Sequence, residues 1–219
     1  MLREVDDKMN LLTKTTALAM DMTLKYVTSG DVVIDATCGN GHDTLTLAEA
    51  VGDLGQVIAL DIQQSALESA GVLLHANAKE NVTFVQGNFR NLAELTTCLL
   101  HDRKPSAIVF NLGYLPGGDK SVTTVREDSV EAVKQALELV AVDGVVTVVL
   151  YCGHEAGKAE KKAVLDMAAE LPAGRFHAVY GGMLNQRKEP PEVLWITKKK
   201  LNFFVGHYEW QMFFVRIYE

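Results

Sequence analysis

The sequence predicts a doubly wound α/β fold around a mostly parallel sheet. Short runs of β-branched and other apolar residues alternate with stretches long enough for crossover helices. The first five runs are almost continuously apolar, as expected for parallel strands that are buried on both faces. The seven strand candidates are Val32–Asp35, Gln56–Asp61, Val82–Gln86, Ala107–Asn111, Val145–Tyr151, Ala178–Tyr180 and Val193–Thr197.

The clearest helix prediction covers Glu127–Val140, between the fourth and fifth strand candidates. Apolar residues recur there at helical spacing from Val130 onward and would form one buried face. Thr124, followed three residues later by Glu127, has the pattern of a capping box, which satisfies free N–H groups at the start of a helix. The predicted helix would therefore connect two parallel strands.

The length of 219 residues predicts one domain with a small appendage. We place a single domain over residues 1–200 and an aromatic C-terminal extension over residues 201–219. The extension carries seven of the 16 aromatic residues of the chain. Packing against the domain is its simplest role, because exposed apolar patches of this density are uncommon, and the alternatives are contact with a second copy in a homodimer and an atypical extension.

Composition and charge exclude several classes of protein. Three cysteines, Cys38, Cys98 and Cys152, form no C-x-x-C pair, which is typical of a reducing compartment. We expect neither a secretory signal nor a membrane span, because the N-terminus lacks an apolar segment and no apolar run approaches 18 residues. The net charge of −7 argues against nonspecific nucleic-acid binding by the whole surface but allows a local basic patch. A cytoplasmic protein is expected.

A glycine turn follows the first strand, where sheets of this kind bind ligands. Asp35 ends the strand, and the turn Gly39-Asn40-Gly41 opens a helix. Glycine lacks a Cβ, so the backbone can turn tightly and approach a ligand. A dinucleotide site would have a third glycine where Thr44 stands, and Asp35 would repel a pyrophosphate. A cationic sulfonium suits the acid, which favours S-adenosylmethionine over NAD; a plain strand-to-helix turn is the alternative.

The second strand also ends in an acid, Asp61. It lies 20 residues after Gly41, the spacing of a carboxylate that accepts hydrogen bonds from ribose hydroxyls. Ile62 and Gln63 follow directly, and we include both in the predicted cofactor site. A helix cap is the alternative role for the acid.

The third strand is followed by Asn88 and Phe89. Asn88 could bind an adenine edge and Phe89 could cover a ring face, whereas the alternative for Asn88 is to cap a helix.

A polar loop that contains Pro116, Gly117 and Gly118 follows the fourth strand. Asn111 offers an uncharged acceptor suited to the amine of a planar substrate, and Tyr114 offers a stacking face. The segment is similar to the N-P-P-Y turn of amino-group methyltransferases, with Leu112 and Gly113 in place of the prolines. The alternative is a surface loop with Tyr114 packed inward.

Histidines and lysines supply weaker candidates. His154, after the fifth strand, could take up a proton, with a backbone contact at a helix start as the alternative. Cys38 and His42 lack further partners at metal-ligand spacing, so no metal is expected. Candidate RNA contacts, which could equally be solvated surface charges, are Lys158, Lys161, Lys162, Arg187, Lys188 and Lys198–Lys200.

Two segments together carry a family resemblance. D-A-T-C-G-N-G-H-D-T and N-L-G-Y-L-P-G-G-D-K resemble class I S-adenosylmethionine-dependent methyltransferases, and within them the bacterial rRNA methylase family that includes MnmM-like tRNA wobble-uridine methyltransferases. The resemblance covers about residues 15–198. It implies a Rossmann-like seven-stranded sheet, S-adenosylmethionine as cofactor, and methylation of 5-aminomethyl-2-thiouridine in the tRNA anticodon region.

The resemblance also completes the set of predicted site residues. The cofactor-binding candidates are Asp35, Thr37, Gly39, Asn40, Gly41, His42, Asp43, Thr44, Asp61, Ile62, Gln63, Asn88, Phe89, Asn111 and Gly113, and the catalytic candidates are Asn111 and Tyr114. Methylation of rRNA or of a small molecule, and S-adenosylmethionine binding without catalysis, are the alternative functions.

Overall fold

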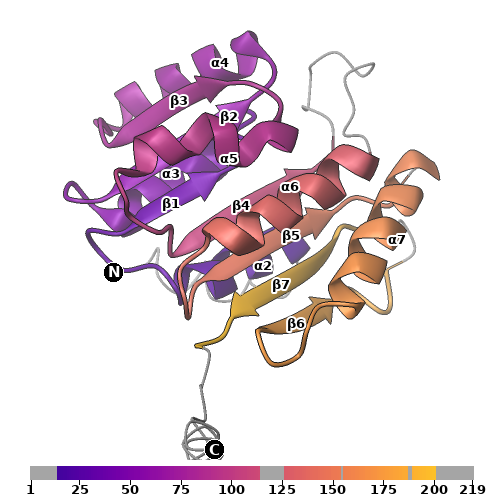
Figure 1. Ribbon diagram of the computed structural model, residues 1–219. Coiled ribbons are helices and arrows are strands. Elements are labelled where there is room, and N and C mark those ends of the chain that lie inside the picture. The colour runs from indigo at the N-terminus through magenta and orange to yellow at the C-terminus, as the bar shows by residue number, and fades with distance from the viewer. Residues whose placement is uncertain (1–13, 114–125, 154, 187–188, 201–219) are drawn as a thin grey trace, which may run out of the picture.

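Seven strands form one sheet in the computed structural model, which describes residues 14–113, 126–153, 155–186 and 189–200 (Figure 1). The strand order is β3-β2-β1-β4-β5-β7-β6. The strands are β1 Val32–Asp35, β2 Gln56–Asp61, β3 Val82–Gln86, β4 Ala107–Leu112, β5 Val145–Leu150, β6 Phe176–Gly181 and β7 Glu192–Lys198. The α-helices are α2 Thr15–Leu24, α3 His42–Val51, α4 Gln64–Ala76, α5 Leu92–Thr96, α6 Arg126–Leu139 and α7 Glu155–Ala169, and the 3₁₀ turns are η2 Phe89–Asn91 and η3 Thr97–Leu100.

The first five strands are parallel, and β7 runs antiparallel between β5 and β6. The chain builds outward from β1 to β3 and then returns to add β4 on the other side of β1. The carboxyl ends of β1, β2 and β4 therefore lie next to one another at the point where the strand order reverses. Such a switch point is where open α/β sheets bind their ligands.

Helices cover both faces of the sheet because successive strand side chains point to opposite sides. Val33 packs in the core beneath α3, α4 and α2, whereas Ile34 packs in the larger core beneath α5, α6 and α7. Both side chains are fully buried. This arrangement confirms the predicted doubly wound, mostly parallel seven-stranded sheet.

The predicted strands and helix match the structure closely, and the differences lie at their ends. Strand β4 continues one residue further to Leu112, and β5 stops one residue earlier at Leu150. The edge strand β6 is longer than predicted, because four of its six side chains face solvent and give no apolar pattern to follow. Thr124 of the predicted capping box and the aromatic extension 201–219 lie outside the described residues, while the Glu127 carboxylate pairs with Arg126.

Two kinds of feature are absent from the described residues. No helix in this part of the chain is both long and apolar enough to cross a membrane. No group of three or more histidine, cysteine, aspartate or glutamate side chains in it is arranged to hold a metal ion.

Candidate active site

The turn after β1 lies between the ends of β2 and β4, because β1 ends earlier than its two neighbours. Asp35 pairs in register with Ala59 and Val109, so β2 and β4 each extend beyond the end of β1. The turn is tied to both neighbours, since the N–H of Ala36 donates to Val109 (2.9 Å) and the N–H of Cys38 donates to Leu60 (2.7 Å). This brings Asp35, Asp61 and Asn111 to one place.

Glycine is required at the second position of the turn. Gly41 has φ +83° and directly precedes α3. A Cβ added there would lie 2.7 Å from the Cβ and 2.8 Å from the Cα of Ala70, which is closer than real Cβ contacts come. Gly39 also has a positive φ, +52°. The turn therefore holds its backbone against α4 and presents the unpaired N–H groups at the start of α3.

Asp35 is buried beneath the turn, with 1% of its surface exposed. Its carboxylate accepts hydrogen bonds from the Thr37 N–H (3.1 Å) and from the Thr44 hydroxyl (2.6 Å). Burial, reinforced by the negative charge of Asp43, raises the pKa of Asp35 to about 7. Thr44, where a dinucleotide site would have glycine, is therefore a hydrogen-bond donor to this acid.

The Asp61 carboxylate closes the other side of the turn. One oxygen accepts from the Gly39 N–H (2.8 Å) and the other from the Gln63 N–H (2.9 Å). A carboxylate has about four lone-pair directions, so two remain for a ligand. Ile62 lies beside it with 50% of its surface exposed, and the Asn40 and His42 side chains are also exposed. Ribose binding by Asp61 stays a prediction, and the place of its carboxylate beside exposed residues is suitable for it.

Asn111 is held from two sides. Its backbone N–H donates to the Thr37 hydroxyl (2.7 Å), and its side-chain Nδ2 donates to the Asp43 carboxylate (3.2 Å). Its Oδ1 is buried and has no hydrogen-bond partner among the described residues. Burial raises the pKa of Asp43, and the hydrogen bond from Asn111 acts in the opposite direction. Gly113 follows, where an added Cβ would come within 3.2 Å of the Tyr151 ring.

Asn88 and Phe89 make contacts within the protein. Asn88 Oδ1 accepts from the Arg90 N–H (2.9 Å), and its Nδ2 donates to Asp128 (3.0 Å), which also pairs with the Arg90 side chain (2.8 Å). Phe89 packs edge-on against Phe110 with ring centroids 6.2 Å apart. The cap that the sequence left as the alternative for Asn88 is confirmed, and contact with adenine stays a prediction.

Sequence reasoning missed the pairing of Asp43 with Asn111 and of Asp128 with Asn88. These partners are 68 and 40 residues apart, and no local pattern connects them. The predicted catalytic Tyr114 and the candidate base His154 lie outside the described residues.

Five of the lysines predicted as RNA contacts, namely Lys158, Lys161, Lys162, Lys198 and Lys199, make local interactions, and no interaction of Lys200 is seen among the described residues. Lys198 donates to the carbonyls of Glu138 and Val140 at the end of α6, and Lys199 donates to the carbonyl of Ala173. The ion pairs of the lysines on α7 are Lys158 with Glu155 and Glu189, Lys161 with Glu192, and Lys162 with Asp166. Arg187 and Lys188 lie outside the described residues.

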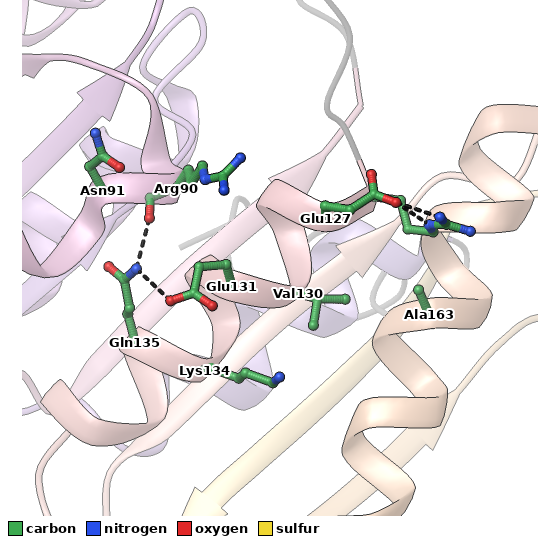
Figure 2. Close-up of a pocket in the computed structure, with 9 residues that line it drawn as sticks. Arg90, Asn91, Glu127, Val130, Glu131, Lys134, Gln135 and Ala163 are labelled. Atoms are coloured by element: carbon green, nitrogen blue, oxygen red, sulfur yellow. Dashed lines mark hydrogen bonds and ion pairs between the residues drawn. The ribbon is translucent and has the colours of Figure 1, made fainter.

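A surface pocket of about 570 Å³ is lined by residues of η2, α6 and α7. Figure 2 shows Gln135 bridging the Glu131 carboxylate and the Arg90 carbonyl across it. Its lining mixes cations such as Lys134 with acids such as Glu127. No predicted cofactor residue lines it, so we assign the site to the strand ends instead.

The strand-end residues fit a cationic ligand with an adenosine group. Asp35, Asp43 and Asp61 are close enough for the latter two charges to raise the pKa of Asp35. None of the ion pairs among the described residues includes any of these three acids. The Asn111 oxygen, which no described residue contacts by a hydrogen bond, adds a buried acceptor. A pyrophosphate would meet repulsion here, whereas a sulfonium or ammonium would be attracted.

Known protein families match the chain over most of its length. The family model described as "Putative rRNA methylase" matches residues 57–197. The model of the ubiE/COQ5 methyltransferase family matches residues 6–100.

Individual relatives agree with the family models. A chloroplastic tRNA (mnm(5)s(2)U34)-methyltransferase of Arabidopsis thaliana is 34% identical over 186 residues, which are 81% of this chain and 67% of the relative. A crystal structure described as a "putative rRNA-methylase" from Clostridium thermocellum superposes with a TM-score of 0.80 at 34% identity, covering 84% of this chain and 97% of that one. A crystal structure described as a "putative methyltransferase" from Streptococcus mutans in complex with SAH gives a TM-score of 0.75 at 29% identity, covering 84% of this chain and 98% of that one.

The acidic glycine turn, the sheet topology and these matches lead to one assignment. The enzyme is an S-adenosylmethionine-dependent methyltransferase, and the chain belongs to the rRNA methylase family.

Proposed function

We propose that the protein methylates the aminomethyl group of 5-aminomethyl-2-thiouridine at the wobble position of tRNA. The observation that carries the proposal is the Asn111 oxygen, a buried acceptor at the ligand edge of the sheet that has no hydrogen-bond partner in the part of the chain that the structure describes. The name of the Arabidopsis relative supports the same reaction class.

Three elements would hold the cofactor. Asp61 would accept hydrogen bonds from the ribose, the Gly39–Gly41 turn would lie against the nucleoside, and the buried acid Asp35 would favour the cationic part of the molecule. When bound, S-adenosylmethionine supplies a methyl group that is electrophilic because it is attached to a positively charged sulfur.

The remaining chemistry belongs to the protein and concerns the amine. The nitrogen must be uncharged and must point its lone pair along the S–CH₃ bond at about 3–3.5 Å. A site that removes water from the amine favours the neutral form. Asn111 Oδ1 would accept one amine hydrogen and so direct the lone pair away from itself. As the N–CH₃ bond formed, the S–CH₃ bond would break and S-adenosylhomocysteine would leave with a neutral sulfur. The methylated nitrogen would then carry a positive charge and lose one proton, and the candidate acceptor for it, His154, stays a prediction.

A small-molecule methyltransferase is a weaker candidate. The ubiE/COQ5 model matches residues 6–100 and ends before Asn111. The match therefore reflects the cofactor half of the sheet, which methyltransferases of many substrates share.

We propose that the protein acts in the cytoplasm, binds tRNA and forms a homodimer.

Because the described lysines on α7 are paired with acids, we expect RNA affinity to depend only moderately on salt concentration. Sedimentation of the purified protein at several concentrations tests the homodimer, and fractionation tests the location.

The deciding experiment is methylation in vitro followed by nucleoside mass spectrometry. The purified protein is incubated with S-adenosylmethionine and tRNA from a strain lacking this enzyme, with rRNA and a short anticodon stem-loop in parallel. We expect the wobble nucleoside of the tRNA to gain one methyl group and the aminomethyl precursor to disappear. Methylation of rRNA alone, or of no RNA, would overturn the substrate assignment.

The matched control is Asn111→Ala. We expect this variant to keep the thermal stabilisation given by S-adenosylhomocysteine and to lose methyl transfer by about 100-fold. Methylation at the normal rate would remove Asn111 from the mechanism while leaving the tRNA assignment in place.

A further inference from the structure

We propose that Asp43 is a positioning residue, which orients the Asn111 carboxamide so that its oxygen faces the substrate amine. The inference rests on the proposed function and adds a role for a residue that would touch neither the substrate nor the methyl group. It assigns Asp43 to the substrate half of the site rather than to cofactor contact.

The two residues come from different parts of the fold. Asp43 is the second residue of α3, and Asn111 lies near the end of β4. Their side chains meet at 3.2 Å between Asn111 Nδ2 and Asp43 Oδ2. The Thr37 hydroxyl fixes the Asn111 backbone by accepting its N–H at 2.7 Å. The carboxamide is therefore anchored at its backbone and at one end of its side chain.

Hydrogen-bond polarity decides which end of the carboxamide is free. An ionised carboxylate only accepts hydrogen bonds, whereas a carboxamide has a donating NH₂ and an accepting oxygen. Asp43 therefore selects the NH₂ group of Asn111, and the planar geometry sends Oδ1 to the opposite side. That oxygen is the buried atom without a described partner. In the flipped carboxamide, the NH₂ would face the amine hydrogens, donor against donor.

Stability alone gives little reason for an acid at this position. Asp43 is partly buried, and its charge raises the pKa of Asp35, which means that the two carboxylates repel each other. The groups that act on Asp43 are the His42 side chain and the Asn111 NH₂, which both favour its ionised form, against burial. An asparagine at position 43 would avoid the repulsion but would no longer select one orientation of Asn111.

Three variants test the role. In Asp43→Asn the new carboxamide can donate or accept, so Asn111 loses its preferred orientation. We expect kcat with tRNA to fall by about 10- to 100-fold while the Kd for S-adenosylhomocysteine changes by less than about threefold. Asn111→Asp sets two carboxylates against each other and should lose activity as well.

The double variant Asp43→Asn with Asn111→Asp exchanges donor and acceptor. The carboxamide at position 43 would then donate to the carboxylate at position 111, whose other oxygen would again face the amine. We expect the double variant to be more active than either single variant, and more so at higher pH, because a carboxylate beside the amine favours its charged form. A purely structural role for Asp43 would give no such recovery.

A readout independent of turnover completes the test. In the NMR spectrum of the nitrogen-15-labelled protein, the Asn111 side-chain NH₂ should exchange slowly with solvent in the wild type and faster in Asp43→Asn. Normal kcat in Asp43→Asn, or a double variant no better than the single ones, overturns the positioning role. If Asn111→Ala is inactive while Asp43→Asn is normal, only the positioning role fails; if wild type methylates no tRNA, the proposed function fails, and the NMR result still decides the orientation.

Discussion

The turn after β1 and the corner formed by α7, β6 and β7 both collect charged side chains, but with opposite outcomes. In the corner, each of the three lysines of α7 forms an ion pair with an acid, and Lys161 lies 2.6 Å from Glu192. In the turn, three acids lie close together, and none of them belongs to an ion pair among the described residues. The corner satisfies its own charges, whereas the turn leaves a negative field for a ligand.

The contrast explains why counting charges along the sequence gave an incomplete prediction. Lys158, Lys161 and Lys162 form a basic cluster in the sequence, yet each pairs with an acid in the structure. The acids of the turn are spread over 27 residues of sequence and form no cluster in it. A local excess of one charge without partners points to a binding site better than a run of like charges does.

The largest effect is expected from Gly41→Ala. The new Cβ would overlap the backbone of Ala70, and φ +83° disfavours alanine. The free energy of unfolding should fall by about 2–4 kcal/mol, with loss of stabilisation by S-adenosylhomocysteine. The matched control is Gly174→Ala, because nothing lies within 4 Å of a Cβ there; it should change stability by less than about 0.5 kcal/mol. Equal effects of the two substitutions in urea titrations would show that the turn does not need glycine.

Sequence reasoning succeeded where the pattern is local. Continuous runs of apolar residues predict the buried strands. Asp35, Asp61 and Asn111 stand at strand ends, which the register of the sheet brings together. It could not reach features that depend on partners far apart in the chain. Asp43 and Asn111, and Asn88 and Asp128, meet only after the sheet has formed. The prediction for the edge strand β6 was too short because four consecutive side chains of this strand are exposed and give no apolar pattern.

The next effect concerns Asp61→Asn. An asparagine offers only one acceptor oxygen for two N–H donors, Gly39 and Gln63, and it loses the negative charge. We expect affinity for S-adenosylmethionine to fall by about 10- to 100-fold in isothermal calorimetry. Asp31→Asn is the control, since a single oxygen of Asp31 accepts both hydrogen bonds from Thr28 in an exposed turn. Unchanged affinity in Asp61→Asn would separate Asp61 from the cofactor site.

A smaller effect is expected from Asp35→Asn, and its sign depends on pH. The pKa of Asp35 rises from 3.8 to about 7 on folding, so between these values the folded protein holds a proton that the unfolded chain has lost. Its contribution to stability is therefore most favourable at low pH and declines as pH rises toward 7. Asparagine stays uncharged and can still accept from Thr37 while donating to the Thr44 oxygen.

Urea unfolding of both proteins at about pH 5 and about pH 8 measures this difference. We expect Asp35→Asn to be more stable than wild type by about 2 kcal/mol at the higher pH, with a smaller gain at the lower pH. If Asp35→Asn is less stable than wild type at both pH values, the Asp35 carboxylate stabilises the fold more than the burial of its charge destabilises it.

The smallest effect is expected in the corner. Combined Lys158→Ala and Lys162→Ala substitutions remove cations that already pair with acids. The Kd for tRNA should change by less than about twofold, and the dependence of binding on salt concentration should keep its slope. A slope reduced by about one per lysine would show that RNA phosphates displace these acids, and the contrast between the two regions would then weaken.

The insertion of β7 between β5 and β6 also sets an order of events during protein synthesis. Strand β6 leaves the ribosome before β7, yet β7 is its neighbour in the sheet, and β6 has no contact with β5 in the strand order. The nascent chain must therefore carry residues 176–181 unattached until residues 192–198 have emerged. Pairing of β6 with the sheet therefore has to wait for β7, so the β6–β7 hairpin joins the sheet only after the five parallel strands have been synthesised.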